Sequence, residues 1–191
     1  MCGNGGRCLV HFAHRQGQIG AETAFEAIDG YHLAILEESQ VRLKMGTPIG
    51  YRRENASRDW LDTGSPHLIE WIAQDSLQAV DVQARGSLLR YDQRYAPGGV
   101  NVNFVRETAD NELEVRTYER GVEGETYSCG TGVTACAYAY LIRNEKTSGC
   151  VHIHTQGGPL SVEIYQRGGE NEEVWLSGPA TFVYSGTVTM R

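Results

Sequence analysis

The 191-residue sequence lacks long apolar runs, C-x-x-C pairs and an excess of positive charge. No window is long and apolar enough to span a bilayer, and no basic-plus-apolar leader stands at the start. The net charge of -7 argues against nucleic acid and anionic membranes as partners. Without a C-x-x-C pair, a structural zinc site loses its usual sequence support, so we expect no metal.

The cysteine count argues against a disulfide framework. Five cysteines is an odd number, and a chain of this length does not need cross-links to fold. Reduced thiols in a cytoplasmic protein are the simpler interpretation. The composition, 40% hydrophobic and 21% charged, is that of an ordinary globular protein with one large domain or two small lobes.

Two short motifs in the chain share the pattern C-G-x-G. They are Cys2-Gly3-Asn4-Gly5 and Cys129-Gly130-Thr131-Gly132. Each opens an apolar stretch of small residues, and each is followed about two helical turns later by a second cysteine, Cys8 or Cys136. The repetition predicts a duplicated structural unit.

Each motif places a thiol beside a glycine-rich helix start. Exposed amides at such a start can hold an anion and lower a thiol pKa from about 8.5 into the range of about 3.5–7.5. A substrate carboxylate bridging both starts would place its α-carbon between Cys2 and Cys129. One thiolate would remove the α-proton while the opposite thiol delivers another, which is stereoinversion without a cofactor. Two buried structural cysteines are the alternative, and the matched settings favour catalysis.

Periodicity predicts strands around two central helices. The first helix should run from Gly5 to Gln16, stopped by Gly17, and the second, over 131–143, should be buried because it has little polar face. A further helix is expected over 82–91. Strands are expected at 23–27, 32–37, 41–45, 60–63, 67–71, 99–105, 113–119, 151–155, 160–165, 173–176 and 181–188.

The fold class predicted is α/β (α+β), with two pseudo-symmetric lobes of strands wrapped around a central helix. Residues 1–48 would be a remnant of the N-terminal lobe and 49–191 the C-terminal lobe, with the last strand returning to the first lobe. Strands and a helix precede the second motif, but only Met1 precedes the first. If the lobes are equivalent, the first is incomplete in this chain.

Other polar residues are candidates for a site. Glu119 and Arg120 leave a strand shortly before the second motif and could bind an amino group and a carboxylate, or form a solvated edge pair. Asn101 and Asn103 share one strand face and could line a polar cleft, or belong to a half-exposed strand. His67 leaves a tight turn, where a histidine without chemistry is slightly favoured.

The remaining histidines and cysteines are given structural interpretations. His152 and His154 share a strand face and are expected at the surface. The three cysteines outside the two motif starts are expected to be buried thiols: Cys8, Cys136 and Cys150.

Together these segments resemble the diaminopimelate epimerase family, over essentially the whole chain. The matching segments are residues 1–8 (MCGNGGRC), 100–104 (VNVNF), 119–132 (from ERG to ETYSCGTG) and 178–186 (from GPA to VYSG). The resemblance implies a two-lobed α/β fold with the active site between the lobes. It also implies interconversion of LL- and meso-diaminopimelate on the route to lysine and peptidoglycan, with neither metal nor pyridoxal phosphate, commonly as a homodimer.

The resemblance also implies roles for individual residues. Cys2 and Cys129 would be the acid–base pair. The remaining positions would bind substrate: amides around Gly3, Asn4, Gly130 and Thr131 would hold the carboxylate, Glu119 and His67 would flank the reacting centre, and Arg120 and Asn101 would read the distal end. Ser65 departs from the asparagine of many members, and the family's N-terminal segment is absent from this sequence.

Three other interpretations stay open. A proline or hydroxyproline racemase of the same architecture also uses two cysteines, although the Gly3-Asn4-Gly5 step and the Glu119-Arg120 pair favour diaminopimelate. The chain could be an inactive epimerase fragment. It could also be a redox protein in which Cys2 pairs with Cys8 or Cys129.

Overall fold

The computed structural model of the chain describes residues 1–73, 77–167 and 171–189. Its helices are α1 (Gly3–Arg15), α2 (Val82–Arg90) and α3 (Gly130–Arg143), with short 3-10 turns η1 (Leu77–Ala79) and η2 (Gln93–Tyr95). Its strands are β1 (Glu22–Ala27), β2 (Gly30–Glu37), β3 (Gln40–Met45), β4 (Ile49–Asn55), β5 (Arg58–Asp62), β6 (Pro66–Trp71), β7 (Asn101–Ala109), β8 (Glu112–Glu119), β9 (Gly124–Thr126), β10 (Gly149–Thr155), β11 (Gly158–Arg167) and β12 (Asn171–Pro179).

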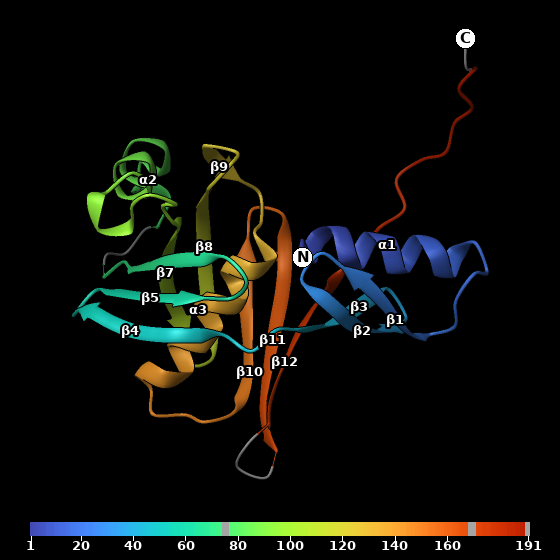
Figure 1. The fold of residues 1–191 in the computed structure, drawn as a ribbon, viewed down its shortest axis with the longest axis horizontal. Helices are drawn as coiled ribbons and strands as arrows, with labels where there is room; N and C mark the ends of the chain where they lie inside the picture. The colour runs from blue at the N-terminus through green and yellow to red at the C-terminus, as the bar shows by residue number, and fades with distance from the viewer. Residues whose placement is uncertain (74–76, 168–170, 190–191) are drawn as a thin grey trace.

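One mixed sheet runs through the described residues in the order β1-β2-β3-β12-β11-β10-β8-β7-β6-β5-β4, with β9 paired to β8. Neighbours on this path are antiparallel except β6–β7 and β8–β10, which are parallel. Figure 1 shows the sheet curving around α3 on one side, while α1 lies against the β1–β3 end. The mixed α/β class expected from the sequence is confirmed.

Helix α1 begins two residues earlier than expected because Cys2 itself caps it. The Cys2 Sγ accepts the Gly5 amide at 3.4 Å, and Gly17 ends the helix region with a φ of +70°, a conformation that glycine adopts without strain. On its sheet side Val10 is buried and Gly6 lies against Leu43. The opposite side of α1, including Leu9 and Phe12, is exposed.

Helix α3 is the buried centre of the second part of the chain, as its sequence predicts. Its residues Val133, Ala135, Cys136, Ala137 and Ala139 are fully buried. At its far end Arg143 binds the fully buried carboxylate of Asp59, which also accepts the Trp71 indole N–H at 2.6 Å. This buried ion pair fixes the C-terminal end of α3 against β5 and β6.

Strand β12 joins the two parts of the sheet, because it pairs with β3 on one side and β11 on the other. Its Leu176 stands opposite Leu43 and Val162 and is fully buried. The division of the chain at residue 48 stays a prediction, since the sheet is continuous across it.

The N-terminal ends of α1 and α3 touch beneath Leu176. A Cβ on Gly130 would lie 3.0 Å from the Gly3 Cα, and a Cβ on Gly3 would lie 2.8 Å from the Leu176 Cδ2. Both approaches are closer than ordinary packing allows, so a larger residue on either side would have to displace its neighbour. The two C-G-x-G motifs therefore meet backbone to backbone.

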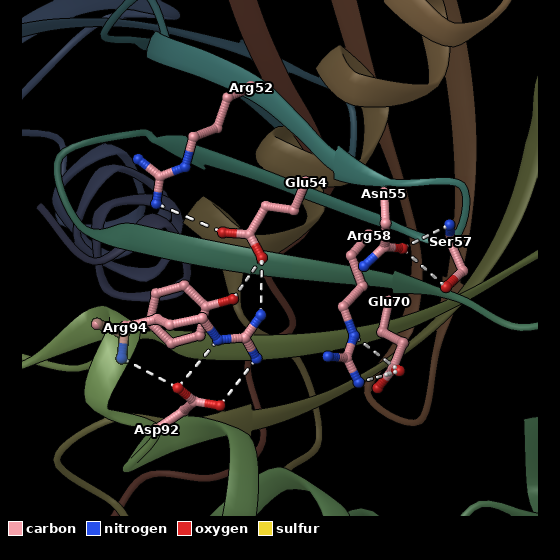
Figure 2. Close-up of polar contacts among 9 residues, drawn as sticks. Arg52, Glu54, Asn55, Ser57, Arg58, Glu70, Asp92 and Arg94 are labelled. Atoms are coloured by element: carbon pink, nitrogen blue, oxygen red, sulfur yellow. Dashed lines mark hydrogen bonds and ion pairs between the residues drawn. The ribbon is translucent and has the colours of Figure 1, made fainter.

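Polar contacts away from this helix contact join η2 to β4 and β5 to β6 (Figure 2). Glu54 accepts the Tyr95 hydroxyl at 2.6 Å and lies 3.9 Å from the Arg94 guanidinium, while Arg58 binds Glu70 at 2.9 Å. None of these residues lines the cavity described below. These contacts are structural, and they account for much of the charge on β4, a strand that periodicity missed because its residues are mostly exposed.

Two expectations are wrong. Residues 181–188 form no strand; a strand needs a neighbour to satisfy its backbone groups, and this segment, which extends away from the fold in Figure 1, pairs with none of the described strands. Cys8 and Cys150 are exposed, because each sits on the solvent side of its helix or strand; Cys136 alone of the three is buried. His152 and His154 are exposed as expected.

The Gly3–Gly130 contact predicts a stability change. Gly130→Ala should lower the free energy of unfolding by about 1–2 kcal/mol, because the new methyl group forces the helix starts apart. Urea unfolding measures this. Gly20→Ala is the matched control, since nothing lies within 4 Å of a Cβ there; equal stability of the two variants would contradict the close contact.

Candidate active site

A cavity of about 640 Å³ opens between the N-terminal ends of α1 and α3. Cys2, Gly3, Asn4 and Arg7 line it from α1 and the residue before it. Further walls come from the first turn of α3 and the ends of the neighbouring strands: Gly64, Ser65, Asn101, Glu119, Arg120, Thr126, Ser128, Cys129, Gly130 and Thr131. The structure thus brings together the site residues expected from the sequence except His67 and Asn103, which lie behind the wall.

The two motif cysteines occupy equivalent positions. Each is the residue before its helix, and each has an extended backbone, with φ/ψ of -87°/114° at Cys2 and -116°/111° at Cys129. The first amides of a helix have no partner within the helix, so two sets of free N–H donors face the same cavity. This arrangement fits a carboxylate held between the helix ends.

The environments of the two thiols differ. Cys2 is exposed, whereas Cys129 is 7% exposed. Burial raises the pKa of the Cys129 thiol; the Thr131 hydroxyl at 3.4 Å and the Gly132 amide oppose that rise, and the Glu119 charge adds to it. The expected lowering of this pKa by the helix start is therefore wrong for Cys129, because loss of hydration outweighs the helix. At neutral pH Cys129 carries its proton.

Glu119 and Arg120 end β8 at the cavity wall. The Glu119 Oε2 accepts the Thr126 hydroxyl at 2.9 Å, which orients the carboxylate. The Arg120 guanidinium lies 3.5 Å from the Gly98 carbonyl. One anion and one cation thus stand side by side on the wall, as the Glu-Arg dipeptide indicated.

Asn101 lines the cavity with a side chain that is already satisfied. Its amide nitrogen donates to the Ser65 hydroxyl at 3.3 Å and the Pro66 carbonyl at 3.2 Å, and its oxygen accepts the Arg120 backbone N–H at 2.9 Å. These bonds tie the ends of β6, β7 and β8 together. Asn103, two residues along, is fully buried and does not reach the cavity.

His67 is fully buried behind Ser65 and Thr131. Its Nε2 lies 3.0 Å from the Ser65 hydroxyl and 3.1 Å from the Thr131 hydroxyl. Burial, helped by the Arg120 charge, lowers the pKa of His67 to about 3. The imidazole is therefore neutral at physiological pH and acts on the cavity through two hydroxyl groups.

The sequence of the chain matches known proteins along its whole length. The family model described as diaminopimelate epimerase matches residues 60–183. The diaminopimelate epimerase of Flavobacterium psychrophilum is 40% identical over 98% of this chain and 73% of its own length. That of Chlorobaculum tepidum is 40% identical over 100% of this chain and 75% of its own. The chain belongs to the diaminopimelate epimerase family.

Solved structures share the fold at lower sequence identity. A Bacillus anthracis phenazine biosynthesis protein of the PhzF family superposes with a TM-score of 0.74 at 13% identity, covering 100% of this chain and 76% of that one. A hydroxyproline epimerase from Agrobacterium vitis gives 0.68 at 19% identity, covering 94% and 63%. At this level of identity, the two matches show that this chain shares their fold, and they carry no information about its substrate.

Arg7 and Thr126 are among the cavity residues that sequence reasoning missed. Arg7 is 6% exposed and donates to the Asn4 side-chain oxygen at 2.8 Å, while the Asn4 amide donates to the Ser128 carbonyl at 2.9 Å. This chain of contacts links α1 to the start of α3. Arg7 lies within the first motif and could have been found there; Thr126 depends on the β8–β9 pairing, which no local pattern indicated.

The described ranges contain no group of three or more His, Cys, Asp or Glu side chains placed to hold a metal ion. In the same ranges, each helix is too short or too polar to cross a membrane.

The lowered pKa of His67 predicts an acid sensitivity. The unfolded chain binds a proton at this position near pH 6.5 and the folded chain only near pH 3, so stability falls as pH falls through that window, by up to about 1.4 kcal/mol per pH unit. His67→Gln should flatten this slope in urea unfolding between pH 7.5 and 4.5. The exposed His152→Gln is the control; equal slopes in wild type and His67→Gln would contradict a buried neutral imidazole.

Proposed function

We propose that this chain interconverts LL- and meso-2,6-diaminopimelate by proton transfer between Cys2 and Cys129. One observation carries the proposal: two cysteines in matching positions, each at the start of its own helix, line a single cavity. Membership of the diaminopimelate epimerase family supports this substrate. The reaction is an isomerisation in which nothing is gained or lost by the substrate.

The helix starts supply the binding site for the reacting carboxylate. The amides of Gly3 and Asn4 on one side, and of Gly130 and Thr131 on the other, are N–H donors without helical partners. A carboxylate among them would place the α-carbon between the two sulfurs. The same donors stabilise the negative charge that develops on the carboxylate when the α-proton leaves.

Proton transfer then needs one thiolate and one thiol. The thiolate takes the α-proton from one face, and the opposite thiol gives its proton to the other face, so the configuration inverts and the two sulfurs exchange protonation states. Cys129, buried and protonated, is suited to donate first, which makes Cys2 the base in that direction. The reverse reaction exchanges the roles.

The wall residues would recognise the rest of the substrate. Glu119 bears the charge to pair with the α-ammonium group, and Arg120 can pair with a carboxylate at the distal end. Ser65, shorter than asparagine, offers one hydroxyl there. Asn101 contributes by holding Ser65 and Arg120 in position, since its own groups are already bonded.

The proposed setting is the route to lysine and peptidoglycan in the cytoplasm. All five cysteines are free thiols, which fits a reducing compartment. The proposed partner is the small-molecule substrate alone. A homodimer stays an expectation from the resemblance.

Loss of either sulfur should abolish stereoinversion. Cys2→Ala and Cys129→Ala should each reduce turnover at least about 10²–10⁴-fold, because each removes an acid–base group. The measurement is NMR of LL- and meso-diaminopimelate in D₂O, which follows both α-deuterium incorporation and stereochemistry.

Cys8→Ala is the matched control, since this exposed cysteine lies on α1 outside the cavity, and its activity should equal that of the wild type. Proline serves as the rival substrate. The proposal would be overturned if the wild type exchanged the α-proton of proline but not that of diaminopimelate. Normal turnover in Cys2→Ala or Cys129→Ala would also overturn it.

A further inference from the structure

Asn103, buried beneath the site, holds a side chain with a fixed orientation. Its Nδ2 lies 3.1 Å from the Leu68 carbonyl and 3.1 Å from the His67 Nδ1, and its Oδ1 accepts the Thr117 hydroxyl at 2.9 Å. A carbonyl can only accept a hydrogen bond. The amide nitrogen must therefore face Leu68, and its second proton is directed at the imidazole.

This orientation decides which nitrogen of His67 carries the proton. Nδ1 faces an N–H donor, so it must be the acceptor. A neutral imidazole has one proton, and it therefore sits on Nε2. The tautomer is set by Asn103 in the same way that a neighbouring hydrogen bond sets the tautomer of other functional histidines.

The protonated Nε2 in turn sets the direction of two hydroxyl groups. Ser65 and Thr131 both place their oxygens within 3.1 Å of Nε2, so the two oxygens share its one proton in a bifurcated hydrogen bond. Neither hydroxyl proton can then point back at the ring. The Thr131 hydroxyl also lies 3.4 Å from the Cys129 Sγ. Turned away from the ring, the Thr131 hydroxyl can donate its proton to the sulfur, and Ser65, which also accepts from Asn101, can present its own proton to the cavity.

We infer that Asn103 is a positioning residue that sets the direction of the hydrogen bonds from His67 through Thr131 to Cys129. The inference rests on the proposed function, in which Cys129 alternates between thiol and thiolate. A hydroxyl that donates to sulfur favours the thiolate, so this chain of bonds offsets part of the penalty of burying Cys129. The offset is needed each time Cys129 gives up its proton.

The packing of Gly132 agrees with a fixed Asn103. A Cβ on Gly132 would lie 2.5 Å from the Asn103 Oδ1, so the first turn of α3 rests directly on the amide and only glycine fits there. The other groups that act on Cys129 are the Glu119 carboxylate and the Cys2 thiol, which oppose the thiolate, and the Gly132 amide, which favours it. Among the side chains acting on this sulfur, the Thr131 hydroxyl is the one that favours the thiolate.

The first test reads the tautomer directly. In ¹⁵N NMR of the wild-type chain, His67 should be neutral with its proton on Nε2 across pH 5–8. A proton on Nδ1 would overturn the inference, because Asn103 would then not be the donor. This measurement requires neither substrate nor turnover.

The second test is a double-mutant cycle on the reactivity of the Cys129 thiol. Asn103→Asp replaces the amide by a carboxylate of the same shape, which when ionised can only accept. Nδ1 then carries the proton, and the Thr131 hydroxyl turns to Nε2. Thr131→Val deletes the same hydroxyl. Each should slow alkylation of Cys129 at pH 8 about tenfold and move its pH profile upward, as followed by mass spectrometry of the Cys129 peptide.

The double variant separates the hydrogen-bond path from simple charge. If Asn103 acts through Thr131, Asn103→Asp should change little in the Thr131→Val background; a full additive effect would show that the new carboxylate acts directly and would overturn the inference. Thr131→Ser keeps the hydroxyl and should retain the wild-type profile. If Asn103→Asp does not fold, the His67 tautomer and the comparison of Thr131→Val with Thr131→Ser still test the inference. A pH profile of Cys129 alkylation that Thr131→Val leaves unchanged would also contradict the hydrogen bonds from His67 through Thr131 to Cys129.

These outcomes are separable from failure of the proposed function. Thiol reactivity and the His67 tautomer are properties of the free chain. Absence of α-proton exchange by the wild type, with the tautomer and profiles as expected, would sink the proposed epimerisation and leave the role of Asn103 standing.

Discussion

The site depends on one contact, the approach of two helix starts without side chains between them. Gly3 and Gly130 meet under Leu176 of β12, the strand that belongs to both parts of the sheet. Because the helices meet at their N-terminal ends, their unpaired amides and the cysteines that precede them face one cavity. A side chain on Gly130 would press on the Gly3 backbone, and so push the two sulfurs and the two sets of donors apart.

The second half of the site is a fully bonded polar network built on α3 and β6–β8. His67, Asn101 and Asn103 are buried, and each has every polar side-chain atom within hydrogen-bonding distance of a partner. A partly satisfied network at this depth would be costly, which is why these residues hold single orientations. The first half is simpler: α1 supplies Cys2, its amides, and the Asn4–Arg7 link to the other helix.

Features that depend on local sequence patterns could be predicted from the sequence. The two C-G-x-G motifs located both helix starts and the cavity, and the small apolar residues of α3 predicted its burial. Pairing partners decided the rest: residues 181–188 have strand-like composition but no strand beside them, and β4 forms although its residues are mostly exposed. The depth of His67 and Asn103 could not be read from period-two alternation either, since both faces of β6 and β7 are covered.

Cys2 and Cys129 share one motif but differ in burial, and therefore in how easily each thiol loses its proton. Their backbone geometry and their position at the helix start are the same, so a helix-based argument assigns both the same pKa. Yet Cys129 is buried, and dehydration there outweighs the helix amides. The buried thiol thus needs a directed donor. Within the described residues the Thr131 hydroxyl can supply it, and its direction is set by His67 and Asn103 deeper in the fold. In a two-base reaction each sulfur must be stable in both protonation states, and this compensation makes the thiolate of the buried cysteine easier to form.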